Sequence, residues 1–242
     1  MRLLTLNTWG RSEPYLARRE RIAQEIATLD VDLCCLQEVF DDDLLEALRS
    51  ATALEHQCTD PRTGLAIASR WPIRSERILH YRSVSPREGF YRGALLCRIE
   101  LDVGDLLVAC THLSFRPVDA SVRRAQVQSL LAALEPIELP RILAGDFNEA
   151  PDGSAIELVR THGFLDTFAA RNPGVPGFTW DQRNPYTVQQ DPPLPDRRID
   201  YMFVDSMLAD RLGDSRIVLD RPDEHGVFPS DHAGVLVELS PR

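Results

Sequence analysis

The sequence predicts an α+β fold in which two β-sheets pack against each other and helices cover their outer faces. Short apolar strands alternate with only a few amphipathic helices, which are spaced unevenly along the chain. Residues 93–112 alternate in polarity and turn at Gly104 and Asp105, which is typical of a hairpin and not of a doubly wound parallel sheet. At 242 residues the chain can bury one large core, so a single domain over residues 1–242 is expected.

The predicted strands are short apolar runs, either continuous or alternating. A continuous run such as 32–39 is typical of a strand that is buried on both faces. Alternation, as in the segment 93–112, is typical of a strand with one face on the core. The predicted strands, in chain order, are 2–7, 32–39, 64–69, 74–81, 93–101, 106–112, 141–147, 198–204, 217–219 and 234–239.

The predicted helices have apolar residues on one face. Segment 16–29 follows Pro14 and places Ile22, Ile26 and Leu29 on the same side. Segment 41–50 begins with acidic residues, which stabilise the N-terminus of a helix. The predicted helices, in chain order, are 16–29, 41–50, 121–134 and 154–161.

Residues 172–197 are predicted to form a long ordered loop. They contain six of the seventeen prolines and have little periodicity. The loop carries Phe178, Trp180 and Tyr186, which either contact a substrate or pack within the loop itself.

Charge and cysteine content restrict the possible functions. The formal net charge of −10 argues against a large basic nucleic-acid footprint. All 27 basic residues are arginine, which excludes Schiff-base chemistry and a phosphate-loop lysine. The five cysteines show no C-x-x-C spacing and fit buried thiols in a reducing cytosol, so a cytoplasmic location is expected. No apolar run approaches the roughly 20 residues of a membrane span, and neither a transmembrane segment nor a signal peptide is expected.

Polar side chains occur at or near the ends of six predicted strands. One such event, as in "ILAGDFNEAPDG", is equally well explained by a turn, because Asp, Asn, Pro and Gly favour turns. Six events with this set of side chains indicate one site at one rim of the sandwich. The residues are Asn7, Glu38, His112, the pair Asp146 and Asn148, Asp200, and the pair Asp231 and His232.

This set of side chains suits the hydrolysis of a phosphate ester. Carboxylate and carboxamide oxygens are hard ligands of the kind that Mg²⁺ and Mn²⁺ prefer. Histidines next to acids can move protons or stabilise a developing oxyanion near neutral pH. Together they fit the attack of water on a phosphoester.

The motifs "LN-x-W", "LQEV", "THL", "GDFN", "RIDY" and "SDH" occur in this order over the whole chain. The sequence therefore resembles the endonuclease/exonuclease/phosphatase superfamily. Its opening "LNTWG", the segment "RRERIAQEI" and "GLAIASRWPI" are closest in style to neutral sphingomyelinases. The resemblance implies a four-layer α/β/β/α sandwich of the DNase I type, with two mixed sheets flanked by helices.

The resemblance also implies roles for the polar residues. Glu38 would be the main metal ligand, Asn7 would lie beside it or on the phosphate, and Asp231 would lie next to the metal. Asp146 and Asn148 would orient and deprotonate the attacking water and contact the scissile phosphate, and His112 and His232 would bind phosphoryl oxygens. Asp200 would steer His232. The expected catalytic residues are therefore His112, Asp146, Asn148, Asp200 and His232. The expected metal-site residues are Asn7, Glu38 and Asp231.

One position departs from the family pattern. Some superfamily members carry an acid two residues after the first Asn, where this chain has Trp9. With fewer carboxylates at the metal, one Mg²⁺ or Mn²⁺ ion is expected and a fixed second metal is in doubt.

Four residues are predicted to contact the substrate: Arg92, Tyr91, Trp180 and Asn184. Arg92 is expected to bind phosphate, because arginine binds phosphate oxygens bidentately. Arg197 and Arg198 come shortly before Asp200 and could pair with it, but they are expected to be solvated.

The leading prediction is a divalent-metal-dependent hydrolase of a phospholipid or small phosphodiester. The alternatives are a nuclease or DNA-end-processing phosphodiesterase, and a catalytically silent binding module. The silent module is disfavoured because Glu38, Asp146, Asn148 and His232 are all present. The substrate is expected to be a lipid, a small molecule or a nucleic acid, and no obligate protein partner is inferred.

Overall fold

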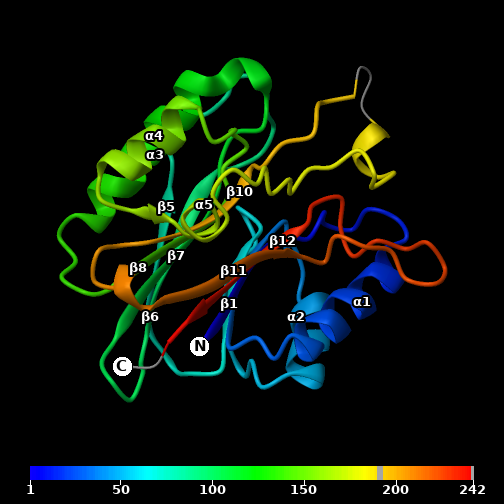
Figure 1. Ribbon diagram of the computed structural model, residues 1–242, viewed down its shortest axis with the longest axis horizontal. Helices are drawn as coiled ribbons and strands as arrows, with labels where there is room; N and C mark the ends of the chain where they lie inside the picture. The colour runs from blue at the N-terminus through cyan, green and yellow to red at the C-terminus, as the bar shows by residue number, and fades with distance from the viewer. Residues whose placement is uncertain (190–192, 241–242) are drawn as a thin grey trace.

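The computed structural model describes residues 1–189 and 193–240 and contains two six-stranded sheets that pack face to face (Figure 1). The strand order is β11-β12-β1-β2-β4-β3 in the first sheet and β5-β6-β7-β8-β10-β9 in the second. Helices α1 and α2 lie on one side of the sandwich, and α3 and α4 lie on the opposite side (Figure 1). The predicted arrangement of two sheets with helices outside is confirmed.

The strands of the two sheets come from both halves of the chain. The first sheet consists of β1 (Arg2–Asn7), β2 (Leu33–Gln37), β3 (His56–Asp60), β4 (Leu65–Ser69), β11 (Leu212–Val218) and β12 (Gly234–Leu239). The second consists of β5 (Ile73–His80), β6 (Gly93–Ile99), β7 (Leu106–His112), β8 (Arg141–Asp146), β9 (Leu165–Asp166) and β10 (Asp200–Val204). The α-helices are α1 (Tyr15–Thr28), α2 (Asp43–Ala51), α3 (Ala120–Leu134), α4 (Ser154–Thr161) and α5 (Thr167–Arg171).

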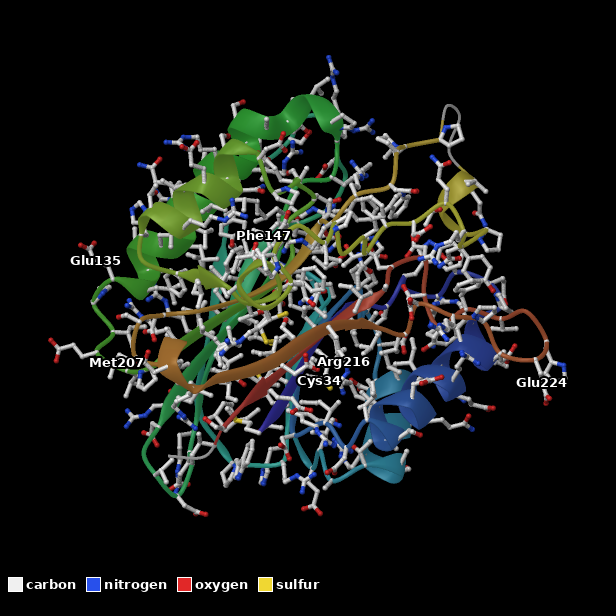
Figure 2. The ribbon with its side chains drawn as sticks, viewed as in Figure 1. Cys34, Glu135, Phe147, Met207, Arg216 and Glu224 are labelled. Carbon is white, nitrogen blue, oxygen red and sulfur yellow. The ribbon has the colours of Figure 1, made fainter. Side chains whose placement is uncertain are left out.

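Three apolar layers separate these elements. Leu33, Val108 and Val235 belong to the layer between the two sheets. A second layer packs α1 and α2 on the first sheet, and a third, with Phe147 in it, packs α3 and α4 on the second. Phe147 lies inside the packed region, whereas Glu135 lies at the periphery (Figure 2). Burying both faces of each sheet explains why several strands read as continuous apolar runs.

Strand register brings the polar strand ends together. Each sheet contains one parallel pair, β1 with β2 and β7 with β8, among antiparallel neighbours. Asn7 pairs with Gln37 in the first sheet, and Asp146 pairs with His112 on one side and Asp200 on the other. Parallel strands end at the same edge, so these residues share one rim of the sandwich.

Three elements lie outside the sequence prediction. Strand β3 has the polar sequence HQCTD and forms the edge of its sheet, so it lacks an apolar pattern. Strand β9 has only two residues, and α5 has five and begins where the Asp166 side chain accepts a hydrogen bond from Ala169 N. Strand β11 runs over Leu212–Val218 and is longer than the predicted 217–219 because a register irregularity disturbs its alternation.

The long predicted loop has little regular structure where it is described. It contains a short 3₁₀ helix, Thr187–Gln189, and an isolated bridge between Trp180 and Arg197. Its residues 190–192 lie outside the described part of the chain. None of the helices in residues 1–189 and 193–240 has the length and apolar character needed to cross a membrane.

Gly145 allows strands β7 and β8 to approach closely just before Asp146. A Cβ at this position would overlap the carbonyl oxygen of Thr111, and the residue has φ +145°. We expect Gly145→Ala to lower the free energy of unfolding by more than about 3 kcal/mol, measured by urea denaturation. Gly104→Ala is the matched control, because Gly104 also has positive φ, +111°, but open space around its Cβ position. Equal losses for the two variants would contradict the steric explanation.

Candidate active site

A cleft of about 410 Å³ opens at the rim where the polar strand ends meet. Most of the predicted site residues lie on the surface of this one cleft. Its lining includes Asn7, Glu38, His112, Asp146, Asn148, Asp231 and His232. Asp200 lies behind this surface and is completely buried.

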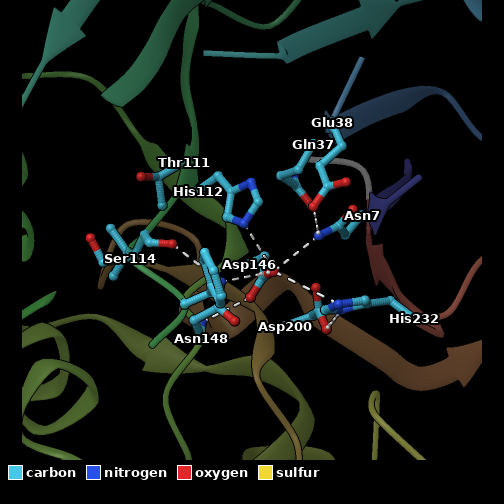
Figure 3. Close-up of polar contacts among 12 residues, drawn as sticks. Asn7, Gln37, Glu38, Thr111, His112, Ser114, Asp146, Asn148, Asp200 and His232 are labelled. Carbon is cyan, nitrogen blue, oxygen red and sulfur yellow. Dashed lines mark hydrogen bonds and ion pairs between the residues drawn. The ribbon is translucent and has the colours of Figure 1, made fainter. Parts of the chain in front are cut away.

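Asp146 is the centre of the hydrogen-bond network at the bottom of the cleft (Figure 3). Its Oδ2 accepts hydrogen bonds from Nδ2 of Asn7 and Nδ2 of Asn148, both at 3.1 Å, and lies 3.3 Å from Nε2 of His112. Its Oδ1 accepts from the backbone N–H of Asn148 at 2.8 Å. Burial raises the pKa of Asp146, but the charges of His232 and His112 outweigh burial and hold this pKa well below its usual range. Asp146 is therefore an ionised carboxylate, and the surrounding hydrogen-bond donors hold it in one orientation.

His232 and Asp200 form a buried ion pair beside Asp146. Nδ1 of His232 donates to Oδ2 of Asp200 at 2.8 Å, which directs Nε2 toward Asp146 Oδ2, 3.9 Å away (Figure 3). Burial lowers the pKa of His232, but the carboxylates of Asp200, Asp231 and Asp146 outweigh it and raise this pKa to about 10. His232 is thus an imidazolium at neutral pH, with Nε2–H available as a donor in the cleft.

Asp200 is held in place by its own neighbours. Its backbone N–H and that of Ile199 both donate to Oγ1 of Thr179, at 3.2 and 3.0 Å. Burial raises the pKa of the Asp200 carboxyl, and the charge of His232 opposes this rise. The fixed carboxylate sets the tautomer and orientation of His232.

Asn7 connects Asp146 to Glu38 across the two sheets. Its Nδ2 also donates to Oε1 of Glu38 at 3.1 Å, and its Oδ1 accepts from the backbone N–H of Trp9 at 3.0 Å. Glu38, Asn148 and Trp9 all adopt positive φ, at +62°, +49° and +59°. Non-glycine residues rarely adopt this conformation, and such strain is concentrated at functional sites.

Glu38 and Asp231 are two further carboxylates in the lining of the cleft. Burial raises the pKa of Asp231 to about 7; the charge of His232 opposes this rise, and the carboxylate of Glu38 adds to it. Within residues 1–189 and 193–240, neither carboxylate has an ion-pair partner. Carboxylate oxygens are ligands that Mg²⁺ and Mn²⁺ prefer, and a cation between two repelling carboxylates would stabilise both.

A second group of metal-ligating side chains overlaps the hydrogen-bond network. Ligand atoms of Asp146, Asp200 and His232 lie within 4.8 Å of one another, so these residues could hold a metal ion. Within this group, Oδ2 of Asp200 accepts the hydrogen bond from Nδ1 of His232. Metal-ligating side chains therefore occur at two places on this rim, at Asp146, Asp200 and His232 and at Glu38, Asn7 and Asp231.

The chain matches the Endonuclease/Exonuclease/phosphatase family over residues 4–232. It belongs to this family. The resemblance predicted from the motifs is confirmed, and members of this family are hydrolases that act on phosphoesters.

Two relatives within this family share part of the sequence. Protein angel of Drosophila melanogaster is 30% identical over 177 residues, which cover 64% of this chain and 50% of that protein. Protein angel homolog 2 of Danio rerio is 29% identical over 164 residues, which cover 57% of this chain and 29% of that protein. The chain therefore spans half or less of the length of these relatives.

Solved structures of the family share the fold over its full extent. D. rerio TDP2, crystallised with a single-strand DNA product, has a TM-score of 0.80 at 18% identity and covers 100% of this chain and 99% of its own. SmcL has a TM-score of 0.79 at 18% identity, covering 99% of both chains. At these identities the likeness shows the fold alone, and the predicted four-layer DNase I-like sandwich is confirmed.

The predicted substrate residues have different surroundings. Tyr91, Arg92 and Trp180 line the cleft, but Nε of Arg92 donates to Glu88 at 3.1 Å, and both of these side chains are buried. Asn184 does not line the cleft; its Nδ2 donates to the carbonyl oxygen of Ser230 at 2.7 Å. Asn184 therefore supports the segment that carries Asp231 instead of facing the substrate.

Sequence reasoning missed other residues that line the cleft: Arg62, Phe115, Arg116 and Arg197. The expectation that Arg197 and Arg198 are solvated is wrong for Arg198, which is 4% exposed and binds Asp166. Arg197 is half-buried in the cleft wall. The only sequence signal for Arg197 is its place three residues before Asp200.

Proposed function

We propose that this protein is a divalent-metal-dependent phosphodiesterase that uses water as the nucleophile. The observation that supports this most strongly is the ionised Asp146 at the bottom of the cleft, surrounded by the donors of Asn7, His112, Asn148 and His232. An anionic acceptor next to several donors suits a reaction in which water attacks a group that gains negative charge.

In this proposal Glu38, Asn7 and Asp231 hold one Mg²⁺ or Mn²⁺ ion. The bound ion supplies Lewis acidity, neutralising charge on the phosphoryl oxygens. Residues of the protein position the attacking water and the phosphate. Asp146 accepts a hydrogen bond from the attacking water and orients it, and its depressed pKa keeps it ionised throughout the physiological range. Because a carboxylate with a low pKa is a weak base, orientation and charge contribute more than proton abstraction.

The two histidines and Asn148 contact the phosphate in this proposal. Nε2 of His232 donates to a phosphoryl oxygen, and Asp200 holds the imidazolium in the required orientation. His112 lies on the other side of Asp146 and supplies a further donor, while Asn148 borders the phosphate and uses both amide hydrogens to hold Asp146 Oδ2 and the carbonyl oxygen of Leu113. These donors are fixed before substrate binds, so little reorganisation is needed as charge develops.

A nuclease is the second candidate, favoured by the side chains that line the cleft. Although the chain carries a net charge of −10, Arg62, Arg92, Arg116 and Arg197 all line this one cavity. Exposed aromatic rings, Phe90 and Tyr91, lie between them in the lining. Arginines interleaved with aromatic rings suit a phosphate chain with stacked bases.

The test is hydrolysis of bis-p-nitrophenyl phosphate with Mg²⁺ or Mn²⁺ and with EDTA. We expect EDTA to abolish turnover, and Glu38→Gln to lower kcat/KM by about 100-fold or more, because the substitution removes a charged metal ligand. Glu46→Gln is the control, since Glu46 is an exposed glutamate on α2. Full activity of Glu38→Gln in EDTA would contradict the proposal.

A further inference from the structure

The cleft wall beside His232 carries two side-chain donors without a partner among the described residues. They are the indole Nε1 of Trp180 and the guanidinium Nε of Arg197, and both atoms are buried. Trp180 is only 6% exposed, and both residues line the cleft. Leaving a buried donor unpaired is costly, so two such donors side by side indicate a place for a ligand's acceptor atoms.

Trp180 and Arg197 are held as a pair next to the reacting groups. Backbone hydrogen bonds join them in both directions, from Trp180 N to Arg197 O and from Arg197 N to Trp180 O, each at 2.9 Å. The guanidinium carbon lies 5.6 Å from the centre of the indole ring, and this ring lies 5.1 Å from the imidazole ring of His232. The backbone therefore fixes both donors beside the catalytic histidine without help from a substrate.

The adjacent Arg198 provides an internal comparison. Its Nε also lacks a partner among the described residues, but its two terminal nitrogens donate to the two oxygens of Asp166, each at 2.9 Å, as expected for a structural arginine. Arg197 has no ion pair and no side-chain hydrogen bond within residues 1–189 and 193–240. Burial lowers the pKa of Arg197, and the charge of Asp146 opposes this effect from a distance. Within the described residues, no carboxylate is close enough to Arg197 to form an ion pair with it.

We propose that Trp180 and Arg197 form an anion subsite for a second phosphate of the substrate, next to the phosphodiester that is cleaved. This inference rests on the proposed function. In that function His112 and His232 supply donors to the scissile phosphate, so the charge of Arg197 is left for a neighbouring anionic group. A guanidinium binds phosphate through two parallel hydrogen bonds, and the indole N–H adds a third donor.

The subsite selects the class of substrate. A phosphodiester flanked by further phosphates gains the attraction of Arg197, whereas a choline phospholipid presents a cation next to its phosphate and is repelled. Arg62 and Arg116 line the same cleft, and neither has an ion pair within the part of the chain that the structure describes. The substrate that fits this distribution of charge is a chain with several phosphates.

The test compares two dinucleotides with the same internal ester. TpT has one phosphodiester and no other phosphate, and pTpTp adds a phosphate at each end. Cleavage of the internal ester is followed by chromatography with Mg²⁺ or Mn²⁺. We expect the wild type to prefer pTpTp by about tenfold in kcat/KM, and Arg197→Gln to bring the ratio close to one. Arg197→Lys should retain part of the preference because it keeps the charge, and Trp180→Phe should lose a smaller part because it removes only the N–H.

Arg183→Gln is the matched control. Arg183 lies in the same loop, but it is exposed, pairs with Asp181 and does not line this cleft. It should therefore leave the wild-type ratio unchanged. A wild type without preference, or an Arg197→Gln variant with the full preference, would overturn the subsite.

A binding measurement separates this inference from the proposed function. Calorimetric titration with TpT and pTpTp in EDTA needs no hydrolysis. If neither dinucleotide is cleaved but pTpTp binds more tightly in a manner that depends on Arg197, the subsite is supported and the phosphodiesterase proposal fails for this substrate. If the two dinucleotides bind equally to the wild type and to Arg197→Gln, the subsite fails whatever the activity.

Discussion

Replacing Asp146 by asparagine is expected to lower kcat for phosphodiester hydrolysis by about 1,000-fold, the middle of the range for loss of a positioned acid or base. The substitution keeps the shape of the side chain but removes the charge that faces His112 and His232. It also replaces one acceptor oxygen by an amide N–H, either Oδ2, which accepts from Asn7 and Asn148, or Oδ1, which accepts from the backbone N–H of Asn148, so at least one hydrogen bond becomes a clash of donors. The attacking water would lose both its acceptor and its orientation.

Kinetics and stability together test this expectation. The rate is measured with saturating substrate and metal, well below the midpoint of thermal unfolding of the variant. Asp210→Asn, an exposed aspartate at the distant 3₁₀ helix Ala209–Arg211, removes the same charge and should keep the wild-type kcat. A folded Asp146→Asn variant within about tenfold of the wild-type rate would show that Asp146 is not part of the reacting centre.

Arg18→Met is expected to cause the largest loss of stability, about 3–5 kcal/mol in the free energy of unfolding. Arg18 on α1 is fully buried, and its guanidinium donates to the backbone carbonyl oxygens of five residues. These are Thr8, Trp9, Gly10, Ser12 and Pro229. Methionine would fill most of the volume but leave these carbonyl groups without their donor.

Thermal unfolding gives the measurement. For a chain of this length such a loss corresponds to a decrease in Tm of roughly 10 °C. The same substitution at Arg124, which is exposed on α3 and donates one hydrogen bond to Ser154 O, should change the stability by less than about 0.5 kcal/mol. Equal Tm values for Arg18→Met and Arg124→Met would contradict the role assigned to Arg18.

The sequence shows which polar residues end the strands, but it does not show which strands lie next to one another or in which register. An acid or amide after an apolar run is visible in the sequence, and so Asp146 and Glu38 can be selected as candidates. Their separation in space depends on strand register, because Asp146 lies opposite both His112 and Asp200 only in the observed pairing. Register is set by contacts between distant segments, which periodicity within one segment does not reveal.

The loop residues were harder to predict for a related reason. Trp180 and Asn184 are four residues apart in a segment without helical or strand periodicity, and one lines the cleft while the other supports Ser230. Arg197 and Arg198 are identical in type, yet they extend to opposite sides of one backbone. Arg198 forms an ion pair with the buried Asp166, and Arg197 lines the cleft. The two residues have the same side chain and the same charge, so only the conformation of the backbone determines which of them faces the cleft.

The first and last strands of the fold are neighbours, since β1 pairs with β12 in the middle of its sheet. The hydroxyl of Ser230 donates to the carbonyl oxygen of Asn7 at 2.6 Å across 223 positions of sequence. Contacts between such remote segments form late, because they close the longest loops. Recovery of hydrolysis during refolding should therefore lag behind the return of helical circular dichroism, and a fragment that ends before β12 should acquire helices without ever becoming an enzyme.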